Sequence, residues 1–171
     1  AIMANVEHKV SLISGVHDLL PNRVGGAALQ KNLETLGDIQ YTQEEIDFAL
    51  ELQRNNGKPE IGIDGKIRPL RETLNSPGGG STDSGDVSYN VPVVSLAATT
   101  APKGVPWHSW SVVASSGMSI GHKGMLHAAK ALGMTMVDIF KDSKLRENIK
   151  KEFDEKIGEY EYDPYLDPGP P

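Results

Sequence analysis

Only two segments of this sequence carry the pattern of a β-strand, and that scarcity limits the folds open to the chain. Residues 5–14 alternate apolar and polar side chains, the period expected of a half-buried strand. Residues 92–98 form a short apolar run, which is typical of a strand covered on both faces. Strands mixed with longer helices indicate an α/β layer structure. Two strands are too few for a complete open sheet, so the pattern predicts part of a domain.

Other apolar residues recur at helical spacing. One predicted helix follows Asn22, a candidate N-cap, and stops at Gly37, and a second starts at the capping box of Thr42 and Glu45. Two more helices are expected over 120–141 and 144–158. Residues 58–85 are rich in Gly, Pro, Ser and Asp and predict a long loop, of the kind that is usually functional or mobile.

Charge and composition disfavour several functions. The chain has 17 Lys and Arg against 23 Asp and Glu, a net charge of −6, and no basic stripe, so nucleic acid and anionic membrane surfaces are not expected partners. No apolar run reaches the length of a membrane span, and the first residues show no signal-peptide pattern. Cysteine is absent, which excludes disulfides and thiolate metal sites and agrees with a cytoplasmic protein.

His108 is the strongest candidate for a functional residue. It stands on a loop bounded by glycine and proline, between Trp107 and Trp110 and just ahead of a helical segment. Imidazole is the commonest metal ligand, and ligands of open α/β sheets bind beyond the carboxyl ends of strands. From spacing alone, a functional histidine and a structural loop histidine packed against the two indoles are equally favoured. A catalytic zinc needs about three protein ligands, and the sequence supplies one secure ligand.

The remaining histidines are weaker candidates. His122 and His127 lie five residues apart on one predicted helix, so they occupy different faces and do not share a metal. His122, in the first turn, stays a candidate for the site, although a polar contact at the helix end is favoured. His8, on a predicted strand, and His17, in a turn, are interpreted as structural.

Two carboxylates, Asp83 and Asp86, mark the loop of residues 80–86. This loop resembles a phosphate-binding loop only superficially, because it lacks the Gly-Lys-Ser/Thr ending and its carboxylates would repel phosphate. Carboxylates of this kind are better suited to orienting a metal ligand or the loop itself. An Asx-turn is the alternative for each aspartate taken alone.

Four motifs taken together resemble the C-terminal part of the zinc-dependent aminoacylase/carboxypeptidase family of amidohydrolases. They occupy residues 10–22, 80–89, 107–110 and 117–125. The resemblance implies part of a zinc-peptidase-like three-layer α/β domain. Residues 1–17 would be the closing strand of a lid or dimerisation domain, residues 18–158 the C-terminal portion of the catalytic domain, and residues 159–171 an extended Pro- and Tyr-rich tail.

The resemblance also implies a cofactor, a substrate class and partners. Two divalent ions, Zn²⁺ or Mn²⁺, would activate water in the intact enzyme. His108 would be a metal ligand, with Asp83 and Asp86 beside the site. The substrate would be an N-acyl amino acid of the p-aminobenzoyl-glutamate type, and a homo-oligomer is expected.

The family's other metal ligands and its general base are not found in this sequence. We therefore expect the chain alone to be inactive and to hold no catalytic metal, with the missing N-terminal half of the enzyme as its partner. Two alternatives remain open. One is a stand-alone, non-catalytic interaction module that kept half of the fold, and the other is a small ligand-binding module that uses the glycine-rich loop.

Overall fold

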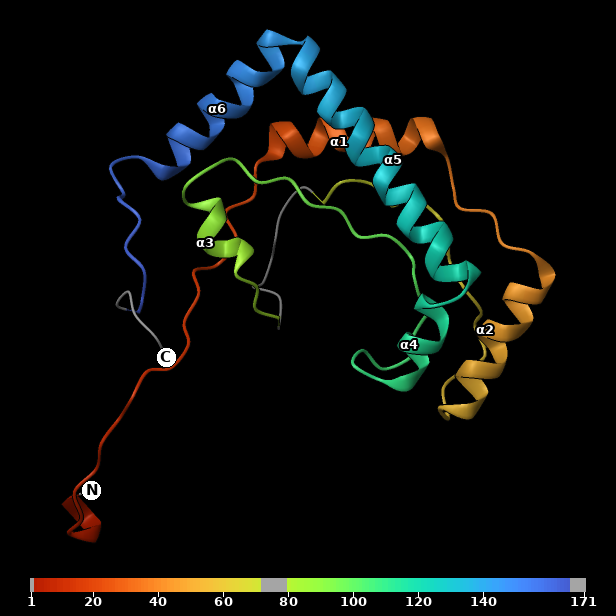
Figure 1. Cartoon of the computed structure of the whole chain (residues 1–171), viewed down its shortest axis with the longest axis horizontal. Helices are drawn as coiled ribbons and strands as arrows, with labels where there is room; N and C mark the ends of the chain where they lie inside the picture. The colour runs from red at the N-terminus through yellow and green to blue at the C-terminus, as the bar shows by residue number, and fades with distance from the viewer. Residues whose placement is uncertain (1, 72–79, 167–171) are drawn as a thin grey trace.

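The computed structural model describes residues 2–71 and 80–166. Within them the chain is built from helices joined by extended segments (Figure 1). Part of the predicted glycine-rich loop, residues 72–79, and the last five residues of the predicted tail lie outside the described residues. The elements are a 3-10 turn η1 (Ile2–Ala4), then α1 (Arg23–Leu36), α2 (Gln43–Asn55), α3 (Ser84–Ser88), α4 (Trp110–Ser116), α5 (Ser119–Lys141) and α6 (Ser143–Ile157).

The expectation of a three-layer α/β domain is wrong for the part of the chain that the structure describes, which holds helices and no strand. Its one pairing of strand type is an isolated parallel bridge between Pro21 and Val93. Residues 5–14, predicted as the closing strand of a lid, are extended and exposed. Residues 92–98 are also extended outside any sheet. An alternating pattern favours an extended backbone, but a strand also requires a neighbour with which to exchange hydrogen bonds.

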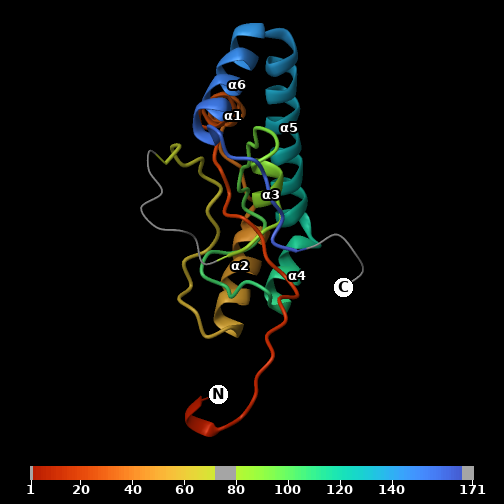
Figure 2. The same ribbon diagram turned by 90° about the vertical axis from the view of Figure 1, so that its left-hand side faces the viewer.

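The helices form an open arch. Helices α5 and α6 meet at an angle at its top, and α1 lies below them and contacts both (Figure 1). Helices α4 and α2 stand at the far end of α5, and a side-chain hydrogen bond of 2.6 Å from Asn56 to Ser111 links these two regions. Residues 5–14 project away from the body in both views (Figures 1 and 2). The extended segment between α3 and α4 lies on the concave side of the arch (Figure 1).

The helix ends predicted from local sequence are confirmed. The side chain of Asn22 accepts a hydrogen bond of 2.8 Å from the amide of Gly25, which starts α1. Gly37 ends that helix with a φ of 75°, a conformation that glycine adopts without steric cost. Thr42 and Glu45 form the reciprocal capping box at the start of α2.

Buried polar side chains join helix α1 to α6. The amide of Asn22 donates to the carbonyl of Ile149 at 2.8 Å. The Glu152 carboxylate accepts the backbone amides of Arg23 and Val24, each at 2.7 Å. A negative charge at a helix N-terminus is favourable because it meets free N–H groups and the positive end of the helix dipole. Helix α6 thus completes the cap of α1.

The same kind of contact recurs elsewhere. Asn32 of α1 donates to the hydroxyl of Thr135 on α5 at 3.0 Å, and both residues are buried. The fully buried amide of Gln53 accepts from the N–H of Gly62 and donates to the carbonyls of Gly62 and Lys103. The bonds of Gln53 hold two extended segments, around Gly62 and Lys103, that do not pair as β-strands.

The apolar core is small, and much apolar surface is left outside it. The buried apolar side chains are Leu29, Ala49, Leu52, Val105, Ile120, Ala131 and Ile149. Exposed large apolar side chains on α5 are Met125, Leu126, Leu132, Met136, Val137 and Phe140. None of the helices among the described residues combines the length and the apolar character needed to cross a membrane.

An ion pair ties the start of α2 to α5. The Glu45 carboxylate lies 2.6 Å from the ammonium of Lys123 and accepts the amide of Thr42 at 2.7 Å. Burial opposes the charge of Glu45, but the hydrogen bonds from Lys123, Ser119 and Thr42 outweigh it and lower the pKa to about 2.

This pair predicts an acid-sensitive stability. Because the folded carboxyl has the lower pKa, its contribution is complete above pH 4.5 and is lost as the pH falls from 4.5 to about 2. We expect Glu45→Gln to lower the free energy of unfolding at neutral pH by about 1–3 kcal/mol and to flatten the decline in acid. Urea denaturation across this pH range measures both effects. Glu60→Gln, at an exposed pair with Arg54, is the control. An unchanged pH profile in Glu45→Gln would contradict the assignment.

Candidate functional site

His108 lies in the turn before α4, with an exposed side chain and an unusual backbone. Its φ is 58°, in the left-handed region, which is uncommon for any residue other than glycine. The hydroxyl of Ser109 donates to the carbonyl of Pro106 at 2.5 Å and closes the turn around His108. Backbone strain of this kind costs about 1–3 kcal/mol and gathers at functional sites.

The two flanking indoles are exposed as well. Trp107 is 71% exposed and Trp110 is 57% exposed, and Val113 on the next turn of α4 is also open to solvent. Tryptophan side chains are usually well buried in isolated domains and are enriched at binding interfaces. The turn around His108 is therefore an apolar surface feature and not part of the core.

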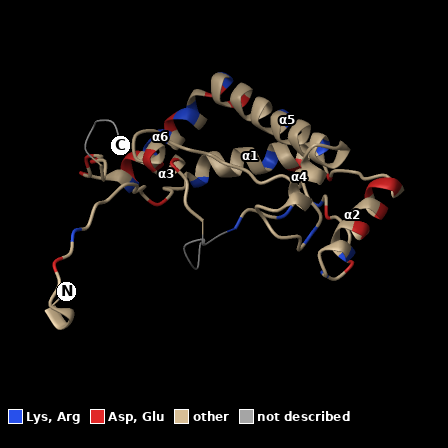
Figure 3. Ribbon diagram, turned by 60° about the horizontal axis from the view of Figure 1, so that its bottom comes forward, with Lys and Arg blue, Asp and Glu red and all other residues tan. Residues whose placement is uncertain are grey.

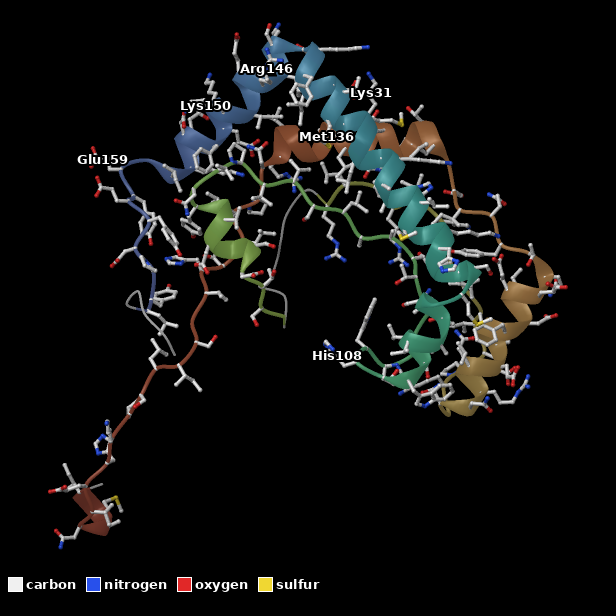
Figure 4. The ribbon with its side chains drawn as sticks, viewed as in Figure 1. Lys31, His108, Met136, Arg146, Lys150 and Glu159 are labelled. Carbon is white, nitrogen blue, oxygen red and sulfur yellow. The ribbon has the colours of Figure 1, made fainter. Side chains whose placement is uncertain are left out.

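The predicted site residues are not brought together. Figure 4 places His108 on one side of the arch, away from α3, which holds Asp86 and is labelled in the same view in Figure 1. Asp83 is exposed at the start of α3 and makes no capping bond with its side chain. His122 is exposed in the first turn of α5. Across residues 2–71 and 80–166, no three His, Asp or Glu side chains lie close enough to hold a metal ion. The described residues alone do not fit a metal pair.

Asp86 instead binds a histidine from a distant part of the sequence. One oxygen of its carboxylate lies 2.7 Å from Nδ1 of His17 and also accepts the backbone N–H of His17 at 3.1 Å. Nε2 of His17 lies 2.8 Å from the hydroxyl of Tyr160 in the C-terminal tail. His17 is only 8% exposed. Asp86, His17 and Tyr160 thus form a continuous hydrogen-bonded chain, which we call the His17 cluster.

Aromatic rings surround His17. The ring of Tyr165 stacks on the imidazole with centroids 4.4 Å apart and planes at 12°. The ring centroids of Tyr162 and Tyr89 lie 5.2 and 5.0 Å from the centroid of the imidazole. Figure 3 shows acidic residues on α3 and on the tail.

Hydrogen bonds set the ionisation of the groups around His17. The backbone amide and the ring of His17 hold the pKa of the Asp86 carboxyl below its usual range. A hydrogen bond of 2.8 Å from Tyr89 to Asp18 raises the pKa of Tyr89 to about 12. Asp86 is therefore an ionised acceptor at neutral pH, while Tyr89 keeps its proton.

Sequence reasoning placed Asp86 beside a metal site and interpreted His17 as structural, and it missed the bond between them. The partners are 69 residues apart, and Tyr160 is 143 residues from His17. The available signal was in the tail, where tyrosines alternate with acidic residues over 160–163. That period of two indicates an extended segment with one face packed.

The structure also holds a cavity of about 750 Å³. It is bounded by α1 and by the extended segments 64–71 and 93–105, and Trp107 is on its border. Lys66, Arg68 and Lys103 are among the cationic residues that line it. Its size is in the range of small-molecule pockets.

Gly85 provides a test of how closely α3 approaches the His17 cluster. A Cβ atom at Gly85 would collide with the backbone carbonyl oxygen of His17, whereas one at Gly80 would meet open space. We predict that Gly85→Ala lowers the free energy of unfolding by about 1–3 kcal/mol and that Gly80→Ala leaves it nearly unchanged. Thermal and urea denaturation measure the difference. Equal stability of the two variants would show that α3 does not lie against His17.

Comparison with curated proteins finds a relative with an established name. A subunit of the p-aminobenzoyl-glutamate hydrolase of Escherichia coli (strain K12) is 34% identical over 157 residues, an alignment that takes in 78% of this chain and 33% of that protein. The chain therefore spans about a third of the length of the relative. No family model matches the chain. No solved structure matches it either. The resemblance of the sequence motifs to a hydrolase of this kind is confirmed for this subunit.

Proposed function

We propose that this chain, a relative of a p-aminobenzoyl-glutamate hydrolase subunit, is the C-terminal part of a hydrolase that cleaves the amide bond of an N-acyl amino acid. The observation that carries the proposal is the 34% identity over 157 residues to a protein whose name states that activity. Because the chain covers a third of that relative, we assign the reaction to a larger assembly and expect the chain alone to be inactive.

Within that assembly we assign His108 as a metal ligand. Its imidazole is exposed on a turn with a left-handed backbone, and imidazole is the commonest metal ligand in proteins. Two divalent ions, Zn²⁺ or Mn²⁺, would lower the pKa of a bound water and polarise the substrate carbonyl. At least part of the ligand set must come from outside the described residues, since no three His, Asp or Glu side chains among them lie close enough to hold a metal ion.

Exposed apolar surface supports a protein partner for the chain. Helix α5 carries Met136 and Phe140, Trp107 lies in the turn before α4 and Trp110 begins α4, and all four side chains are exposed. Apolar surface of this extent is typical of interaction sites. The relative is itself named as a subunit. We therefore expect the chain to associate with the rest of the hydrolase and to form oligomers.

A ligand-binding module without catalysis is the second candidate. The cavity beneath α1, with its apolar lining and its cations, supports this alternative. It predicts reversible binding of an acidic small molecule by the chain alone.

The hydrolase proposal is tested by supplying the rest of the enzyme. A chimera is made in which this chain replaces the matching third of the E. coli relative. The release of p-aminobenzoate from p-aminobenzoyl-glutamate by this chimera is then measured. We predict that the chimera hydrolyses the substrate and that His108→Ala reduces kcat/KM by roughly 100-fold or more, because loss of an outer partner of a metal ligand already costs about 10–100-fold. His8→Ala, at an exposed position on the N-terminal segment, is the matched control.

Two outcomes would contradict the proposal. A chimera with native circular dichroism and native size but no hydrolysis would reject the assigned activity. A His108→Ala chimera with full turnover and full metal content would reject His108 as a ligand and leave the activity assignment in place.

A further inference from the structure

The His17 imidazole is buried and uses both of its nitrogen atoms. Nδ1 faces Asp86 at 2.7 Å and Nε2 faces the hydroxyl of Tyr160 at 2.8 Å. An ionised carboxylate only accepts hydrogen bonds, so Nδ1 is the donor to Asp86. In the uncharged ring Nε2 is then an acceptor, and the hydroxyl of Tyr160 donates to it. Asp86 therefore fixes the tautomer that the tail recognises.

The tail supplies most of the surroundings of His17. Tyr160 provides the hydrogen bond to the imidazole and Tyr165 the stacked ring. Tyr162 provides a third ring, with its centroid 5.2 Å from that of His17, and its hydroxyl also bonds to Asp86. These rings keep water away from the imidazole, and a hydrogen bond shielded from water is stronger than an exposed one. The tail thus covers one side of the His17 side chain.

Helix α3 depends on this cluster for its position. It has five residues, too few to be stable alone, and it makes no extensive contact with the other described helices. Its side-chain bonds lead instead to the segment around His17. The hydroxyl of Ser88 accepts the N–H of Leu20 at 2.8 Å, and Tyr89, just after α3, donates to Asp18.

We propose that His17 is a positioning residue through which the C-terminal tail fixes the acidic loop of residues 80–88. Tyr160 holds the imidazole, the imidazole holds Asp86, and Asp86 holds α3 and the neighbouring Asp83. Loosening the tail therefore loosens a loop that is distant in sequence, while the arch of α1, α5 and α6 stays intact. This inference concerns the chain by itself and does not require the hydrolase function.

Hydrogen–deuterium exchange on the chain measures this coupling directly. We expect Tyr160→Phe, which removes only one hydroxyl, to raise exchange of the amides of residues 84–91 about 5–10-fold, the effect of losing one hydrogen bond. Exchange in α5 should not change. Tyr165→Phe keeps the stacked ring and is the matched control. A chain that ends at Glu159 should show the same loop-specific increase, and a larger one.

Conservative replacement of His17 separates positioning from simple packing. Asn keeps a donor near the place of Nδ1, so His17→Asn should protect residues 84–91 better than His17→Ala. His17→Leu fills similar volume without hydrogen bonds and should behave like His17→Ala. Unchanged loop exchange in both Tyr160→Phe and the shortened chain would overturn the proposal. Equal exchange in His17→Asn and His17→Leu would overturn it as well.

Discussion

The hydrogen bonds of one buried imidazole hold together three segments that share no secondary structure. Residues 15–20, helix α3 and the C-terminal tail are joined by hydrogen bonds of side chains and by the close backbone approach at Gly85, and His17 contacts both other segments. A polar group removed from water must be hydrogen-bonded, so the position of each partner is specified by the other. The same requirement acts at the start of α1, where Asn22 and Glu152 bind segments far apart in sequence. Hydrogen bonds of buried polar side chains therefore connect the segments, in place of the sheet that the strand pattern had predicted.

The features that sequence reasoning predicted correctly are local ones. Asn22, Gly37 and the pair of Thr42 and Glu45 act on backbone groups within a few residues, so their chemistry could be read directly from the order of the residues. The strands were wrong because pairing depends on neighbours that the pattern does not contain. The bond of Asp86 to His17 was missed for a related reason, since the two residues are 69 positions apart in the sequence.

The structure separates the two regions that the motifs had suggested were one site. His108 stands in a strained, exposed turn at the end of the arch near α4, and Asp86 is bound to His17 beside α3 (Figures 1 and 4). The exposed indoles beside His108 and the exposed apolar side chains of α5 agree with contacts to the partner proposed for the chain.

The tautomer of His17 tests the account most directly. Nitrogen-15 NMR of the labelled chain distinguishes a protonated Nδ1 from a protonated Nε2. We predict that the proton is on Nδ1, where Asp86 accepts it, and that Nε2 accepts the hydroxyl of Tyr160. The proton should stay on Nδ1 in Tyr160→Phe. In Asp86→Asn the ring should no longer prefer the Nδ1-protonated form. A ring protonated on Nε2, or one that averages between both forms in the unmodified chain, would contradict the account.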